Sequence, residues 1–240
     1  MSRIYEIDGV EYPSVTSLIG TLSKGDQLLT WASKQALDYV ANNMGGGMPL
    51  EKIFENAKTN HLIVLDEAAS IGSEIHALIE KNIKGQWFDY RTIQRPEVKK
   101  AFFGYLDWKK AHRVRFVTTE KTVVSKIHGF AGTLDTVLEF EGHLYVTDWK
   151  SSNSIYDTFG LQLSAYREAL REMGLKTDGQ IIVRLDKATG KSETKEFTQS
   201  HEKNLDAFLK LVDFWYSFKS RRLKGNPRAN SAELKARLVA

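Results

Sequence analysis

Two short runs near the middle of the chain alternate apolar and polar residues, a pattern typical of strands with one buried face. They cover residues 133–140 and 143–149. Between them stands Glu141-Gly142, a pair that suits a tight turn because glycine accepts positive backbone φ angles. The pattern predicts an antiparallel hairpin, and we expect the other elements to assemble around it.

This hairpin carries two carboxylates and a lysine in matching positions. Asp135 lies early in the first strand and Asp148 late in the second, so strand pairing brings both to one end. Lys150 points to the same side as Asp148, because side chains alternate faces along a strand. Hard cations such as Mg²⁺ or Mn²⁺ take oxygen ligands, and the Trp149 carbonyl is a further candidate. The group predicts a metal-dependent phosphodiesterase site, although an Asp-x-Lys sequence alone is usually solvated charge.

Outside this hairpin, apolar residues recur at helical spacing in several segments and alternate in others. The predicted helices cover 15–22, 27–43, 62–84, 96–112, 158–173 and 201–223. The predicted strands form a small hairpin at 4–12 and continue at 113–127, 180–185 and 193–197. We expect an α/β fold with a central mixed sheet flanked by helices. We also expect a single domain over 1–240, with a helical N-terminal part at 1–112, a catalytic core at 113–225 and a polar tail at 226–240.

Aromatic and basic residues interleave between positions 99 and 115. Single-stranded nucleic acid is bound by base stacking together with a basic track, so this segment is a candidate strand path. The favoured interpretation, however, is that its aromatic residues, Phe102, Phe103 and Trp108 among them, belong to the buried core. A second basic group, Lys219, Arg221, Arg222 and Lys224, is expected to be a solvated helix end.

Composition narrows the function classes. The formal net charge of +4 permits a nucleic-acid partner without requiring one. The chain has no cysteine, which excludes disulfides, thiolate zinc sites and cysteine-ligated iron-sulfur clusters. No N-terminal apolar region and no run of roughly 18 apolar residues is present. We therefore expect a cytoplasmic protein without membrane contact.

Four motifs, in the order GSEIHALIE, GTLD, DWK and QLSAY, carry a family resemblance. Together they resemble the RecB-like branch of the PD-(D/E)xK nuclease superfamily, and most closely its mitochondrial genome maintenance exonucleases and their phage relatives. The likeness extends from YPSVT at 12–16 to IIVRLD at 181–186. The GTLD segment departs from the Pro-Asp of the superfamily name, but glycine is common there in this branch. The resemblance implies a restriction-endonuclease-like core.

The resemblance also implies roles for residues that spacing alone does not assign. His76, on the helix predicted over 62–84, would coordinate metal together with Asp135 and Asp148. Lys150 would be the catalytic lysine. Glu120, in the strand that precedes GTLD, would be a further ligand; the alternative is an ordinary exposed pair with its neighbour Lys121. The helix residues Gln162 and Tyr166 would steady the lysine and contact the phosphate backbone.

The resulting functional prediction is a metal-dependent DNA exonuclease that acts on strands with free ends, as a monomer. The resemblance favours single-stranded substrate and a role in DNA replication, recombination or repair, in a bacterium or a phage-infected cell. One alternative is a structure-specific or restriction-type endonuclease on the same fold. Another is a non-catalytic DNA-binding subunit with a decayed site, against which the complete set of acidic residues and the lysine argues.

Overall fold

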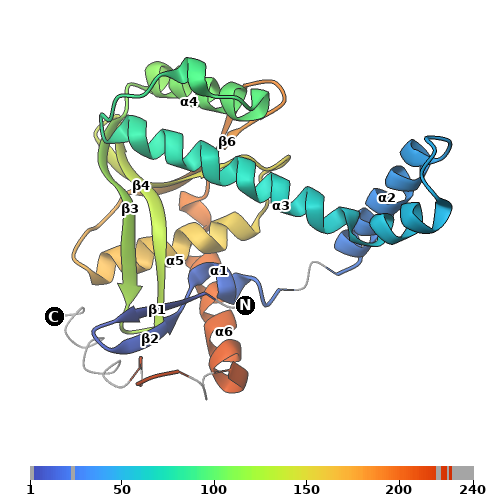
Figure 1. The fold of residues 1–240 in the computed structure, drawn as a ribbon. Coiled ribbons are helices and arrows are strands. Elements are labelled where there is room, and N and C mark those ends of the chain that lie inside the picture. Colours follow the sequence, from blue (N-terminus) through green and yellow to red (C-terminus); the bar gives the residue numbers. More distant parts are fainter. Residues whose placement is uncertain (1–2, 23–24, 220–222, 226, 229–240) are drawn as a thin grey trace. The chain divides into compact units, whose positions relative to one another are not determined.

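The computed structural model describes residues 3–22, 25–219, 223–225 and 227–228 of the chain (Figure 1). Most of the polar tail predicted at 226–240 lies outside the described residues, as do Arg221 and Arg222 of the predicted basic helix end.

One five-stranded sheet forms the centre of the fold, with the order β3-β4-β5-β6-β7. The strands are β3 (Arg115–Ser125), β4 (Phe130–Phe140), β5 (His143–Lys150), β6 (Gly179–Leu185) and β7 (Ser192–Glu196). Neighbouring strands are antiparallel except β5 and β6, which are parallel. The predicted mixed central sheet is confirmed. A separate two-stranded sheet pairs β1 (Ile4–Ile7) with β2 (Val10–Pro13).

Six α-helices and two short 3₁₀ turns accompany the sheets within the described part of the chain. The helices are α1 (Val15–Ile19), α2 (Gly25–Asn43), α3 (Leu50–Ile83), α4 (Pro96–His112), α5 (Thr158–Glu172) and α6 (His201–Lys219). The 3₁₀ turns are η1 (Tyr90–Thr92) and η2 (Thr198–Ser200).

Local sequence accounts for most of the element boundaries. Glu141 and Gly142 have φ angles of 51° and 80°, as a tight turn between β4 and β5 requires. Pro96 begins α4, where its missing N–H is not needed. The prediction for α3 was wrong at its start, because the helix begins twelve residues before position 62. In that first stretch only Ile53 and Ala57 are buried, so the apolar pattern is sparse.

Helices cover both faces of the sheet (Figure 1). On one face, the Trp149 ring contacts Tyr105 and Trp108 of α4 edge-on, with centroid distances of 5.2 and 5.3 Å. Phe102 of α4 is also fully buried, whereas Phe103 is 41% exposed. Most of the aromatic side chains between 99 and 115 therefore belong to the core rather than to a strand path.

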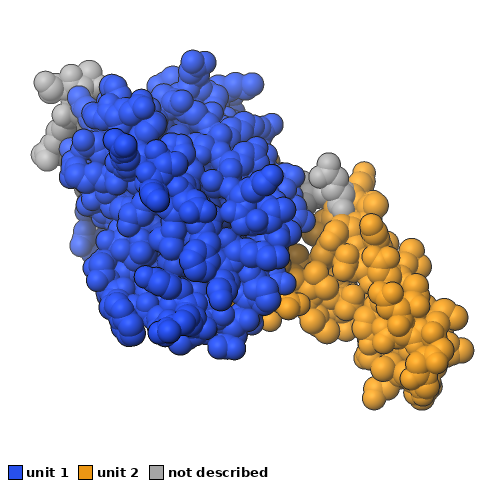
Figure 2. Space-filling view, turned by 90° about the horizontal axis from the view of Figure 1, so that it is seen from above, with its two compact units in different colours: residues 1–21, 75–240 blue, residues 22–74 orange. Residues whose placement is uncertain are grey.

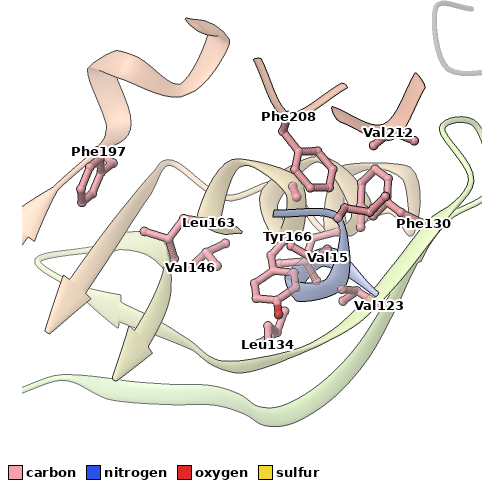
Figure 3. Packing of buried hydrophobic residues seen from close by; sticks show 14 of the residues in the cluster. Val15, Val123, Phe130, Leu134, Val146, Leu163, Tyr166, Phe197, Phe208 and Val212 are labelled. Atoms are coloured by element: carbon pink, nitrogen blue, oxygen red, sulfur yellow. The ribbon is translucent and has the colours of Figure 1, made fainter. Parts of the chain in front are cut away.

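The larger part of the core lies on the opposite face, between the sheet, α5, α6 and α1. Figure 3 shows this packing, in which side chains from distant segments meet. It includes Val15, Val123, Phe130, Leu134, Val146, Leu163, Tyr166, Phe197, Phe208 and Val212. The Phe130 and Phe208 rings meet edge to face at 5.0 Å. Helix α5 is thereby fixed against the strands that carry Asp135 and Asp148.

The chain divides into two compact units, residues 22–74 and the remainder, coloured in Figure 2. In the smaller unit, α2 and the first part of α3 are joined by side-chain hydrogen bonds. Asn56 Nδ2 donates to the Tyr39 hydroxyl at 3.1 Å, and Asn60 Nδ2 donates to the Gln35 carbonyl at 3.2 Å. The larger unit holds the whole five-stranded sheet, and the single-domain organisation over 1–240 stays a prediction. No described helix combines the length and apolar composition that crossing a bilayer requires.

Candidate active site

The β4–β5 hairpin sets its two aspartates side by side. Thr136 pairs with Thr147, which places Asp135 and Asp148 in the next, directly opposed positions on the same face. The Trp149 backbone N–H donates to Asp135 Oδ2 at 2.8 Å. This bond crosses between the strands and fixes the carboxylate at the end of the hairpin. The predicted juxtaposition therefore follows from strand register.

Two further side chains reach Asp135 from outside the hairpin. His76 on α3 places Nδ1 3.4 Å from Asp135 Oδ2. Glu120 comes from β3, the strand next to β4. Each of the three side chains offers one ligand atom, and these atoms all lie within 4.8 Å of one another. Three segments that are distant in sequence thus supply the nitrogen and oxygen donors of one cluster.

Glu120 has an unusual backbone conformation for a strand residue. Its φ angle is +48°, in the left-handed region that non-glycine residues rarely occupy. The ladder between β3 and β4 pairs Thr119 with Thr136 and Lys121 with Leu134, but skips the intervening position. Such strain costs on the order of 1–3 kcal/mol and tends to occur at functional sites. In this strand it coincides with the carboxylate that joins the cluster.

The other half of the site is built around Asp148. Lys150 Nζ lies 2.5 Å from Asp148 Oδ2, and Gln162 Nε2 of α5 donates to Asp148 Oδ1 at 2.9 Å. Gln162 Oε1 accepts from Lys150 Nζ at 3.2 Å, and Gln162 Nε2 is 3.3 Å from the Tyr166 hydroxyl. Gln162 therefore contacts each of the other three side chains. All the residues that sequence reasoning singled out are gathered in these two halves, although the role of each stays a prediction.

Sequence reasoning missed one neighbour of the lysine. Lys150 Nζ lies 5.0 Å from the centre of the Phe159 ring, within the range of a cation–π interaction. Phe159 stands three residues before Gln162 on α5, so both side chains lie on the same side of the helix. Helical spacing from Gln162 was the signal that could have found it.

Two carboxylates of the site, Asp135 and Asp148, are held largely out of water, whereas Glu120 is exposed at its edge. Burial, followed by repulsion from Asp135, raises the pKa of Asp148 to about 6. Burial and Asp135 also raise the pKa of Glu120. Burial alone would lower the pKa of His76, but the Asp135 carboxylate outweighs it and raises that pKa to about 9. For Asp135, the cationic neighbours His76 and Lys150 outweigh burial and hold the pKa below its usual value.

A comparison of the sequence with known protein families identifies the family to which this site belongs. A sequence model of the PD-(D/E)XK nuclease superfamily matches residues 76–224, which include His76 and every later residue of the site. The chain belongs to this superfamily. It is therefore a nuclease domain of a family that uses divalent metals, which implies a DNA substrate. A comparison with curated proteins finds no match to the chain.

The residues of this PD-(D/E)XK site fit a divalent cation. His76 supplies a ring nitrogen, and Glu120 and Asp135 each supply a carboxylate oxygen. These three atoms lie within 4.8 Å of one another, close enough to bind one ion. Asp148 Oδ2 is buried and, although it lies beside Lys150, accepts no well-aligned hydrogen bond from the described residues. Burial, and after it repulsion from Asp135, raises the pKa values of Glu120 and Asp148, and a cation would offset the repulsion.

Close packing explains why the GTLD motif of this nuclease begins with a glycine, Gly132. A Cβ atom at Gly132 would lie 2.6 Å from Cε1 of the Tyr166 ring. Only a residue without a side chain lets α5 lie this close to β4, and that approach carries Gln162 to Asp148.

A second cluster of similar composition lies elsewhere in the nuclease, and sequence reasoning did not predict it. His128 follows β3, while Glu168 and Glu172 lie one turn apart on α5. His128 Nε2 is 3.5 Å from Glu168 Oε1 and 3.9 Å from Glu172 Oε1. Both carboxylates already have hydrogen-bond donors: Arg171 for Glu168, and Ser125 with the Ile127 N–H for Glu172.

Proposed function

We propose that this chain is a metal-dependent DNA exonuclease of the RecB-like branch, acting on single strands with free ends in replication, recombination or repair. The observation that carries the proposal is the pairing of two groups at one end of the hairpin. A cluster of His76, Glu120 and Asp135 stands beside Asp148 and its lysine. The order of the motifs, similar to that of mitochondrial genome maintenance exonucleases and their phage relatives, supports the exonuclease assignment.

Each half of the site has its own task in this proposal. The cluster of His76, Glu120 and Asp135 would hold Mg²⁺ or Mn²⁺, with Asp148 and the Trp149 carbonyl as further ligands. A bound divalent cation lowers the pKa of a coordinated water and neutralises charge on the phosphate. The cluster thereby fixes the point on the protein at which the phosphate is attacked.

Lys150 acts on the reacting phosphate through its charge. Its ammonium is held by Asp148, by the Gln162 carbonyl oxygen and over the Phe159 ring. Burial alone would lower the pKa of Lys150, but Asp148 and Asp135 outweigh it and raise that pKa, so the lysine stays protonated and supplies a fixed positive charge and hydrogen-bond donors. It orients the attacking water and stabilises negative charge on the phosphate, while Gln162 and Tyr166 keep its position.

Digestion of end-labelled linear and covalently closed circular single strands tests the proposal. We expect the linear strand to be degraded with Mg²⁺ or Mn²⁺, and to remain intact with EDTA. The circular strand should survive under all conditions. Cleavage of circles would replace the exonuclease with an endonuclease, and activity that persists in EDTA would refute the metal requirement. A chain that binds DNA but cuts neither substrate would be the non-catalytic subunit.

A further inference from the structure

One large aromatic side chain on the larger unit is almost completely exposed. Trp87 lies in the connection between α3 and α4, and 87% of its surface is accessible to solvent. Tryptophan normally buries 150–250 Å² of surface, so leaving it in water forgoes a substantial gain in stability. The other tryptophans of this unit, Trp108, Trp149 and Trp215, are only 2–3% exposed. The exposure of Trp87 therefore needs an explanation other than folding.

The loop around Trp87 is anchored by its other aromatic residues. The Phe88 ring contacts Phe102 of α4 edge-on, with a centroid distance of 5.4 Å. Tyr90 contacts Phe88 at 5.5 Å and Phe102 at 6.5 Å. Asp89 caps η1 by accepting the Arg91 N–H at 2.9 Å. Since its neighbours are packed against α4, Trp87 is held in an ordered connection with its ring facing solvent.

Positive charge surrounds this position in the sequence. Residues 81–100 contain six lysine or arginine residues and two acidic residues. Their formal net charge of +4 equals that of the whole chain. Several of the cations, such as Lys84, Arg91 and Lys99, are exposed. An exposed ring within a basic segment is the combination by which proteins bind single-stranded nucleic acid.

The loop also lies close to the candidate active site along α3. His76 stands on this helix, and the charges of Glu80 and Lys84 act on the pKa of Glu120 across the site. From His76 to the helix end at Ile83 is roughly 10 Å at 1.5 Å per residue. Phosphates of one B-DNA strand are about 3.4 Å apart along the axis, so a bound strand reaches the loop within a few nucleotides.

We propose that Trp87 is a stacking platform for a base of the substrate strand, a few nucleotides from the phosphate at the active site. The proposal rests on the proposed function, because it assumes that DNA occupies the site built around Asp135 and Asp148. Unpaired bases stack on the exposed ring, while the basic residues of 81–100 follow the phosphates. Duplex DNA, whose bases are already stacked on one another, gains nothing from this contact.

Equilibrium binding without cleavage tests the proposal. The anisotropy of a fluorescein-labelled single-stranded oligonucleotide is measured in EDTA at low salt with the full chain. Stacking is worth about 1–3 kcal/mol per base, so Trp87→Ala should weaken binding roughly 5- to 150-fold. Trp87→Phe should retain most of the affinity, and duplex binding should not change. Phe218→Ala, at a ring that is 71% exposed on α6, is the matched control and should bind like the wild type.

A probe within the oligonucleotide locates the contact. With 2-aminopurine placed at successive positions, its fluorescence should be quenched over a narrow window of positions in the wild type and not in Trp87→Ala. Equal single-strand affinity in wild type and Trp87→Ala, or quenching that survives the substitution, would overturn the proposal and leave a protein partner as the occupant. Because both measurements exclude metal, they stand independently of cleavage: a chain that never cuts DNA but binds it through Trp87 would refute only the nuclease proposal.

Discussion

Two clusters in the larger unit contain the same kinds of side chain but differ in what remains available on them. Each joins one histidine and two carboxylates whose ligand atoms lie within 4.8 Å. In the first, Glu120 and Asp135 meet His76 from different elements. In the second, Glu168 and Glu172 stand one turn apart on α5 beside His128. Composition alone does not distinguish the two.

Hydrogen bonding does distinguish them. Arg171 donates to both oxygens of Glu168 at 2.8 and 2.7 Å, and Glu172 accepts from Ser125 and from the Ile127 N–H. In the first cluster, Glu120 accepts no hydrogen bond from the described residues, and the bonds to Asp135 fall on Oδ2. Carboxylate oxygens that protein donors have saturated have little capacity left for a cation. We therefore infer that the first cluster is suited to metal and the second stabilises the fold.

The largest expected effect comes from the lysine beside the first cluster. We expect Lys150→Met to lower kcat by roughly 10²- to 10⁴-fold, because the fixed charge at the phosphate is lost. Single-turnover cleavage of labelled strands measures the loss. Lys210→Met, at an exposed lysine on α6 paired with Asp206, is the control and should cleave normally. Near wild-type turnover in Lys150→Met would show that the catalytic group lies elsewhere.

Glu120 offers a way to separate function from stability. Glu120→Gln should weaken metal binding about 10- to 100-fold, as measured by titrating cleavage with Mn²⁺. Glu120→Gly should lose as much metal affinity as Glu120→Gln. Its free energy of unfolding should nevertheless be higher by about 1 kcal/mol, because glycine accepts the φ of +48° at this position without strain. Glu139→Gln, on β4 in an exposed pair with Arg115, is the matched control. Unchanged metal dependence in both Glu120 variants would remove this carboxylate from the site.

In the second cluster the effect should fall on stability instead. Glu168→Gln removes a buried charge from its bidentate partner Arg171, and we expect the free energy of unfolding to fall by about 1–3 kcal/mol. Urea denaturation at neutral pH measures this loss. The metal dependence of cleavage should not move. A changed Mn²⁺ requirement in this variant would contradict the assignment of the two clusters.

The smallest effect is a dependence of stability on pH. Burial alone would raise the pKa of Glu168, but hydrogen bonds from Arg171 and then His128 outweigh it and lower that pKa to about 2, from an ordinary 4.5. The stabilisation from this depressed pKa is complete above pH 4.5 and is lost as the pH falls towards 2. The wild type should therefore lose more unfolding free energy between pH 5 and pH 3 than Glu168→Gln. Parallel curves for the two proteins would contradict this explanation.

Local patterns were enough to predict the half of the site that lies on the hairpin. The turn at Glu141 and Gly142 and the alternation of side chains together place Asp135, Asp148 and Lys150 on one face. Both features depend on neighbours in the sequence, which periodicity reports directly. The rest of the mixed sheet followed less directly, because β6 is a short apolar run that is buried almost throughout and β7 is exposed at every position.

The remaining parts depend on long-range packing that periodicity does not report. His76 was found through the family resemblance, because nothing in α3 itself shows which strand the helix crosses. The cluster around His128 was missed, since that residue meets Glu168 only after α5 packs against β3 and β4. The start of α3 was missed because few of its first residues are buried. Trp87 lies in a basic stretch of the sequence, but only its exposure in the structure distinguishes it from a core tryptophan.

The contact between Gly132 and Tyr166 has a consequence for how this site can vary. The Tyr166 ring already fills the space that a Cβ at position 132 would need, so the separation between α5 and β4 is at its minimum. Any larger side chain there displaces the helix, and with it the amide that reaches Asp148 across 2.9 Å. A single methyl group at position 132 would therefore act as a spacer between helix and sheet, and it would shift Gln162, and through it Lys150, without touching either.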